Sequence, residues 1–128
     1  MSSTTLPDER SEPILRLHHG TDESSATDLL RDGVDERQAA VFNVSGEFWA
    51  TTGLAEAETF AQVNPAAGLP TIYSFDIPLQ VLQAMLTANP PRAYQHTTSG
   101  VDWYEFLPKS FPLLNLHMTN RQIDPPAP

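Results

Sequence analysis

The sequence predicts an α+β domain with a small mixed or antiparallel sheet and flanking helices. The chain has 128 residues, which suffices for one ordinary domain and is too short for two. Short runs that alternate apolar and polar residues, as strands do, lie between segments whose apolar residues recur at helical spacing. The resulting order, β-α-β-α-β-α-β-β, contains single strands between helices and ends on two strands, which favours the α+β class.

Local signals place each element in chain order. Residues 13–18 alternate and predict the first strand, Thr21 and Asp22 are available to cap the helix that follows, and Gly33 comes after its end. Residues 71–77 alternate most clearly, and Pro78 suits the first turn of the next helix. The expected strands are residues 13–18, 48–51, 71–77, 103–107 and 113–119, the expected helices are residues 24–31, 54–63 and 79–86, and residues 90–100 are expected to form a long loop.

The composition of the two ends differs from that of the middle. Residues 1–12 are polar and are expected to form a flexible N-terminal segment. Residues 122–128 are expected to form a Pro-rich tail, because its prolines cannot continue a helix or a central strand. A single domain is therefore expected over residues 13–121.

Charge and composition narrow the classes of partner. The net charge of −9, from 16 acidic and 7 basic residues, disfavours broad binding to nucleic acid but is compatible with a local basic patch. The chain has no cysteine, which excludes disulfides, thiolate metal sites and a cysteine nucleophile. No stretch approaches the roughly 20 apolar residues of a membrane span, and residues 1–5 lack the features of a signal peptide. The expected location is the cytoplasm, or a target cell if the chain is delivered as an effector.

A pair of histidines ends the first expected strand, where the sequence is Leu-His-His-Gly-Thr. Neighbouring side chains of a strand point to opposite faces, so only one of His18 and His19 can face a given cleft. Gly20 allows a ligand to approach the backbone closely, or a positive φ, and Thr21 offers a hydroxyl. The alternative is a strand-to-helix turn with incidental histidines. The histidines lack the spacing of common zinc motifs, so no metal site is expected.

Aromatic and acidic residues stand out in two later segments. Phe48 and Trp49 are neighbours in a short strand, so one of them is expected to face a cleft. Phe60 follows on the next helix, where core packing is the simpler explanation. Glu105 lies in the aromatic and apolar run of residues 102–108. It is either a partly buried functional acid or a solvated residue on an edge strand.

These three segments, in this order, resemble the ADP-ribosyltransferase superfamily, and in particular the diphtheria-toxin and poly(ADP-ribose) polymerase branch with its His, Tyr, Glu motif. Small bacterial domains of that branch begin L-Y-H-G-T, continue with G-x-F-Y-x-T-T before an alanine-rich helix, and end on E-[FY]-[LV]-x-P. The matching stretches here are Leu17-His18-His19-Gly20-Thr21, Gly46-Glu47-Phe48-Trp49-Ala50-Thr51-Thr52 and Glu105-Phe106-Leu107-Pro108. The resemblance implies a catalytic-type domain of ADP-ribosyltransferase-like fold with a split sheet.

The resemblance also implies how the first motif would bind NAD, which is the substrate and needs no metal. His19 would hydrogen-bond the adenosine-side ribose. Gly20 and Thr21 would contact the nicotinamide amide and its ribose. Basic residues for the phosphates are few, and Arg31 and Arg37, close after the first helix, are the candidates.

The second and third motifs would supply the ring contacts and the acid. Trp49, or Phe48 beside it, would replace the tyrosine that stacks under the nicotinamide ring, and Phe60 would form the opposite wall. Glu105 would be the catalytic glutamate, which holds the 2′-hydroxyl of the nicotinamide ribose and stabilises the positive charge that develops as nicotinamide leaves. This prediction is geometric: His19, Trp49 and Glu105, far apart in the sequence, should line one slot.

The implied function is NAD-dependent ADP-ribosyl transfer, or NAD glycohydrolysis, by a bacterial toxin or effector-like domain. The acceptor would be a protein, a nucleic acid or water, and an antitoxin or immunity protein would be a partner. Two alternatives stay open. One is a non-catalytic relative of the same fold that binds a nucleotide or a protein, for which the tryptophan at position 49 is the main support. The other is a nuclease that uses His19, His96 or His117 as acid and base.

Overall fold

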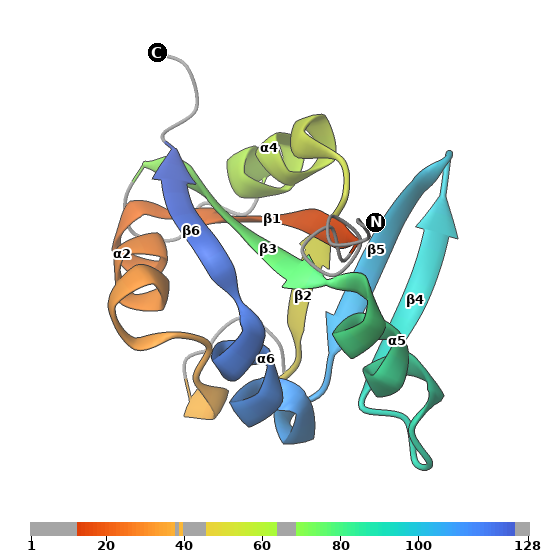
Figure 1. Cartoon of the computed structure of the whole chain (residues 1–128). Coiled ribbons are helices and arrows are strands. Elements are labelled where there is room, and N and C mark those ends of the chain that lie inside the picture. Colours follow the sequence, from red (N-terminus) through yellow and green to blue (C-terminus); the bar gives the residue numbers. More distant parts are fainter. Residues whose placement is uncertain (1–12, 38, 40–45, 64–68, 125–128) are drawn as a thin grey trace, which may run out of the picture.

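The computed structural model describes residues 13–37, 39, 46–63 and 69–124 of the chain. Strands and helices alternate along most of this length, as Figure 1 shows. The strands are β1 (Ile14–Asp22), β2 (Phe48–Thr51), β3 (Pro70–Pro78), β4 (Ala93–Thr98), β5 (Val101–Phe106) and β6 (Thr119–Asp124). The helices are α2 (Glu23–Asp32), α4 (Leu54–Val63), α5 (Leu79–Thr87), the 3-10 turn η1 (Pro108–Ser110) and α6 (Phe111–His117).

The described strands form one six-stranded sheet in the order β4-β5-β2-β1-β3-β6. Every neighbouring pair in this order is antiparallel. Helices flank the sheet rather than forming parallel crossovers between neighbouring strands. The predicted α+β class is therefore confirmed, and of the two sheet types that were left open the antiparallel one forms.

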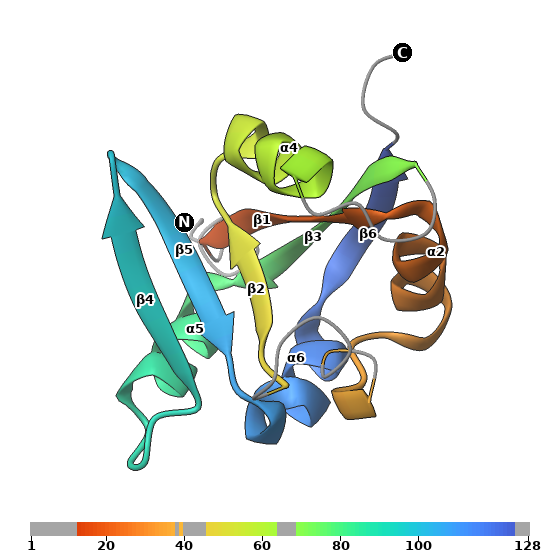
Figure 2. The ribbon, with the colours of Figure 1, turned by 180° about the vertical axis from the view of Figure 1, so that it is seen from behind.

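The pairing between neighbouring strands is shortest at the centre of the sheet, between β1 and β2. β1 pairs with β3 along its whole length, residues 14–22 against residues 70–78. In contrast, β1 and β2 share the single register pair His18 with Thr51. Figure 2 shows β2 crossing β1 steeply, with β5 and β4 continuing on its side. The sheet is thus split into two three-stranded halves, β4-β5-β2 and β1-β3-β6, which meet at His18.

The two faces of the sheet are covered differently. α2, α5 and α6 lie on one side of β1, and α4 is the described helix on the other side (Figure 1). We call these sides the core face and the α4 face. The main hydrophobic core lies on the core face and includes fully buried Leu17, Phe75 and Phe106. On the α4 face, a smaller cluster joins Ala57 and Ala61 of α4 to Ile72.

The ends of α2 follow from its local sequence. The Asp22 carboxylate accepts a hydrogen bond from the backbone N–H of Ser25 at 2.8 Å, which satisfies a free amide of the first turn. At the other end Gly33 has φ +83° and its N–H donates to the carbonyl of Leu29 at 2.9 Å. A positive φ costs glycine little, so the helix stops there. The structure thus confirms the predicted helix and its stop, and of the two cap candidates, Thr21 and Asp22, it uses Asp22.

The expected loop over residues 90–100 is wrong, because residues 93–98 form β4. Among its side chains only that of Ala93 is buried, so the strand carries no apolar alternation that a sequence can show. The strand forms by pairing with β5 in a hairpin. Ser99 and Gly100 have φ of +53° and +78°, as in the type I′ turns that close two-residue hairpins.

The expected strand over residues 113–119 is also wrong, because residues 111–117 form α6. Pro112 lies in the first turn of this helix, and Phe111 and Leu114, three residues apart, are buried together. β6 follows and runs through residues 122–124, which the sequence assigns to the tail. Residues 125–128 of that tail and the expected flexible segment 1–12 lie outside the described residues.

Candidate functional site

Trp49 and Glu105 lie side by side on the α4 face. They are direct cross-strand partners in the pairing of β2 with β5. His96, from β4, completes the group: its Nε2 is 3.0 Å from Oε1 of Glu105. The imidazole also stacks on the indole of Trp49, with ring centroids 5.2 Å apart and planes 29° apart. We call these three residues the Trp49–His96–Glu105 cluster.

The carboxylate of Glu105 is held in this cluster with limited access to solvent. Its side chain is 20% exposed, and that of His96 is 48% exposed. A carboxylate in such a partly desolvated place needs a hydrogen-bond partner, and His96 is that partner. The sequence left two interpretations of Glu105 open, a partly buried acid and a solvated residue on an edge strand. The structure shows that Glu105 is partly buried.

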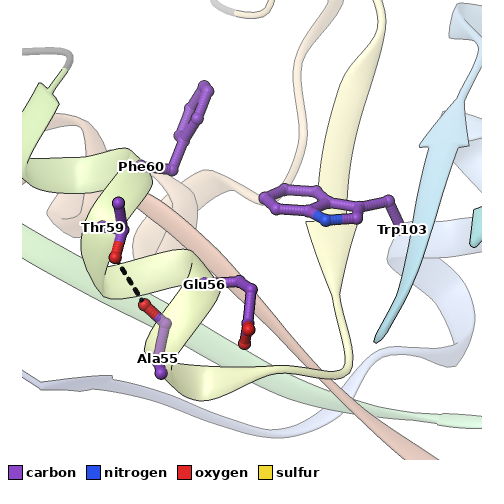
Figure 3. A pocket seen from close by; sticks show the side chains of 5 residues that line it. All are labelled: Ala55, Glu56, Thr59, Phe60 and Trp103. Atoms are coloured by element: carbon purple, nitrogen blue, oxygen red, sulfur yellow. Dashed lines mark hydrogen bonds between the residues drawn. The ribbon is translucent and has the colours of Figure 1, made fainter. Parts of the chain in front are cut away.

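A pocket opens beside the cluster, between α4 and β5. Its volume is about 330 Å³. Phe60 and Trp103 form two of its walls, with ring centroids 6.1 Å apart and planes at 64° (Figure 3). Trp103 is two residues before Glu105 and therefore projects from the same face of β5. The pocket is lined by Ala55, Glu56, Thr59, Phe60 and Trp103.

His19 lies on the opposite side of the sheet from this cluster. Its imidazole stacks on Phe48, with ring centroids 4.3 Å apart, and Phe48 belongs to the main core. Nδ1 of His19 lies 2.6 Å from the backbone carbonyl oxygen of Trp49. The expectation that His19, Trp49 and Glu105 line one slot is therefore wrong for His19, which touches the backbone of Trp49 but projects away from both side chains.

The register at the split explains which histidine faces which way. His18 is paired with Thr51, and Thr51 with Trp103, so these three side chains project from the α4 face. Adjacent His19 must then project from the core face. Nδ1 of His18 and Oγ of Ser74 are 2.7 Å apart and form a hydrogen bond. The sequence shows that the two histidines differ in direction but not which one shares a face with Glu105.

The contacts of His19 fix its tautomer. The carbonyl oxygen of Trp49 only accepts, so Nδ1 carries the proton, and Nε2 of the neutral ring is left as an acceptor. Burial lowers the pKa of His19 to about 4, against opposing effects of the Trp49 hydrogen bond and the charge of Asp22. The ring is therefore neutral at neutral pH, and it acts as a hydrogen-bonding link between β1 and β2.

This lowered pKa predicts a pH-dependent stability. Because the unfolded chain binds a proton at His19 more readily, stability is lost as the pH falls from 6.5 toward 4. We expect His19 alone to make the protein about 2 kcal/mol less stable near pH 5 than near pH 7.5. In His19→Asn, the side-chain amide offers a donor to the same carbonyl but does not titrate, so this difference should largely vanish in urea unfolding curves.

The matched control for this prediction is His18→Asn, one residue earlier on the other face. The pKa of His18 is also lowered, mainly by burial, so this variant should remove a smaller share of the pH dependence. If His19→Asn kept the full wild-type difference between the two pH values, the burial of a neutral His19 would be the wrong explanation.

Gly20 and Thr21 are both buried in this structure. A Cβ on Gly20 would overlap the carbonyl oxygen of Ala57 and lie 2.9 Å from the backbone nitrogen of Ala61. The glycine thus permits close approach of α4 to β1, and its φ is not positive. Thr21 is 6% exposed, beside the cap of α2. Gly20 therefore brings α4 against β1, and Thr21 is a buried residue next to the cap of α2.

The phosphate candidates are placed less favourably than the sequence suggests. The guanidinium of Arg31 is paired with Asp32 at 2.9 Å and with Asp28 at 2.8 Å, on the exposed side of α2. The backbone N–H of Arg37 donates to the carboxylate of Asp35. Arg31 is thus already engaged by neighbouring carboxylates of its own helix.

The sequence analysis named His96 only as a nuclease candidate, and it assigned neither His96 nor Trp103 to the NAD site. His96 falls in the segment expected to be a loop, so no alternation could relate it to Glu105. Trp103 had a usable signal, because it stands two residues before Glu105 in a strand that was expected.

The fold and this cluster define an α+β protein with a split antiparallel sheet that has an acidic and aromatic site on its α4 face. No protein-family model matches the chain, and no curated protein matches it either. None of the helices in the described residues is both long and apolar enough to cross a membrane. Among the same residues, no three His, Cys, Asp or Glu side chains gather as a group that could hold a metal ion.

Proposed function

We propose that the α4 face binds NAD and that the protein cleaves the bond between nicotinamide and ribose, as an ADP-ribosyltransferase or an NAD glycohydrolase. The observation that carries the proposal is the pairing of Trp49 with Glu105 beside an open aromatic pocket. The resemblance of the second and third motifs, which contain Trp49 and Glu105, supports the same chemistry, whereas His19 of the first motif faces the core. The acceptor of ADP-ribose is a protein, a nucleic acid or water.

The pocket suits the nicotinamide end of NAD. Its volume of about 330 Å³ is at the small end of ligand pockets, which fits one ring rather than a dinucleotide. The nicotinamide ring of NAD is a cation, and the faces of Phe60 and Trp103 attract cations. Glu56 adds a carboxylate to the same lining. The aromatic faces of the pocket and the carboxylate of Glu56 therefore both favour a pyridinium ring over a neutral ring.

Glu105 is the group for the chemical step. Trp103 and Glu105 are two residues apart on one face of β5, about 7 Å along the strand, so a ring against Trp103 places its sugar toward the carboxylate. Glu105 accepts a hydrogen bond from a ribose hydroxyl and stabilises positive charge at the anomeric carbon. The bond to nicotinamide breaks with both electrons going to the ring nitrogen. The acceptor then bonds to the anomeric carbon and loses a proton.

The position of His19 favours a second candidate, a protein that binds NAD or ADP-ribose without turning it over. In that case the cluster and the pocket recognise the ligand, and the position of His19, the histidine of the first motif, on the core face explains the lack of catalysis. A nuclease has less support, because His19 and His96 lie on opposite faces and cannot act as one acid–base pair.

Nicotinamide release and ligand binding distinguish these candidates. The chain is incubated with NAD, and free nicotinamide is measured by chromatography. NAD and ADP-ribose binding are measured by calorimetry. Release supports the enzyme, and binding without release supports the second candidate. Neither binding nor release would reject both. Under the proposal, the protein acts in the cytoplasm or as a delivered toxin or effector, with an antitoxin or immunity protein as partner.

A further inference from the structure

We propose that His96 is a positioning residue that fixes the carboxylate of Glu105 for the reaction. This inference rests on the proposed function and adds to it a residue from a strand that none of the three sequence motifs includes. It follows from the one side-chain hydrogen bond that Glu105 makes within the described residues, Nε2 of His96 to Oε1 at 3.0 Å.

The direction of this hydrogen bond follows from the chemistry of the two groups. An ionised carboxylate only accepts, so Nε2 of His96 must carry the proton. The bond occupies one oxygen of Glu105 and leaves Oε2 for a ligand hydroxyl. Such a bond holds the carboxylate plane in one orientation, and a group held in advance loses little freedom when the reaction begins.

The imidazole is itself held in place by its neighbour. Trp49 stacks against the ring of His96 at 5.2 Å, and Trp49 is paired directly with Glu105 across the strands. The three side chains come from β4, β5 and β2, so each is supported by the same half of the split sheet. One side of the Trp49 ring is therefore used to hold His96, which leaves Phe60 and Trp103 as the pair for a ligand ring.

The position of His96 makes the inference testable without loss of the fold. β4 is an edge strand, and the side chain of His96 is 48% exposed, so its replacement removes little buried surface. Neighbouring Gln95 is also exposed and projects from the other face, which makes Gln95→Leu a matched control.

The experiment compares His96→Leu, His96→Gln and Gln95→Leu in nicotinamide release from NAD. We expect His96→Leu to lower kcat by about 10- to 100-fold with KM for NAD within about threefold of the wild type, because the carboxylate is present but misplaced. His96→Gln, whose amide can donate in place of Nε2, should stay within about threefold of the wild-type kcat. Gln95→Leu should match the wild type. Wild-type kcat in His96→Leu, or equal losses in the Leu and Gln variants, would overturn the inference.

The imidazole tautomer gives a readout that does not depend on turnover. The ¹⁵N resonances of the His96 ring, identified by their loss in His96→Gln, should show a proton on Nε2. A proton on Nδ1 alone would overturn the inference. If the wild type releases no nicotinamide, the proposed function fails, and with it the role of His96 in the reaction, while the tautomer still decides whether the hydrogen bond to Glu105 exists.

Discussion

Replacing Glu105 with glutamine is expected to lower the rate of nicotinamide release from NAD by about 10²-fold or more. The substitution keeps the shape of the side chain and an oxygen that can accept from Nε2 of His96. It removes the negative charge that would face the positive charge on the ribose as nicotinamide leaves. Because that charge develops only in the transition state, kcat should fall far more than the affinity for NAD.

The control for this variant is Glu36→Gln, which makes the same change of charge at an exposed acid away from the cluster. It should release nicotinamide at the wild-type rate. Both proteins are compared for kcat, for NAD affinity by calorimetry and for thermal unfolding. A Glu105→Gln protein that is folded and as active as Glu36→Gln would remove Glu105 from the mechanism.

Replacing Gly20 with alanine is expected to produce the largest loss of stability. The new Cβ would overlap the carbonyl oxygen of Ala57, and the nitrogen of Ala61 would be 2.9 Å away. Both are backbone atoms of α4, so no side chain can rotate out of the way and the helix itself must retreat from β1. Overpacking of this kind costs about 3 kcal/mol, near the upper end of its usual range. For a domain of this size the midpoint of thermal unfolding should fall by about 10 °C.

Gly100→Ala separates this effect from the general cost of replacing a glycine. Gly100 has φ +78°, and a Cβ there would meet no atom within 4 Å. Its substitution should cost about 1 kcal/mol, from backbone conformation alone. Equal losses in the two variants would show that contact between α4 and β1 is not what requires Gly20. Because α4 also carries Phe60, Gly20→Ala should weaken NAD binding at temperatures where the protein is still folded.

Sequence reasoning succeeded where the signal is local. The cap at Asp22 and the stop at Gly33 depend on side chains and backbone within a few residues, so the predicted helix is close to α2. The strand expected over residues 71–77 forms as β3, residues 70–78, although residues 71–75 are buried in succession rather than alternately. For the same reason the sequence could group Trp103 with Glu105, since alternation relates the directions of side chains within one strand.

Sequence reasoning failed where an element depends on distant residues. β4 has exposed side chains and forms because β5 offers it hydrogen bonds, so composition alone indicated a loop. α6 has apolar residues that fit a strand or a helix, and packing of Phe111 and Leu114 into the core decides between them. His96 was missed as a neighbour of Glu105 because it lies in β4, which the composition indicated to be a loop.

The sequence by itself determined the α+β class, the positions of most helices and strands, and Trp49 and Glu105 as candidate site residues. Each of these follows from patterns over a few neighbouring residues. Only the tertiary structure decided that His19 faces the core while Glu105 faces α4. That outcome depends on the register of β1 against β2, in which His18 pairs with Thr51. A shift of one residue in this register would exchange the faces of His18 and His19. The register depends on how the two halves of the sheet pack, so no local sequence pattern predicts it.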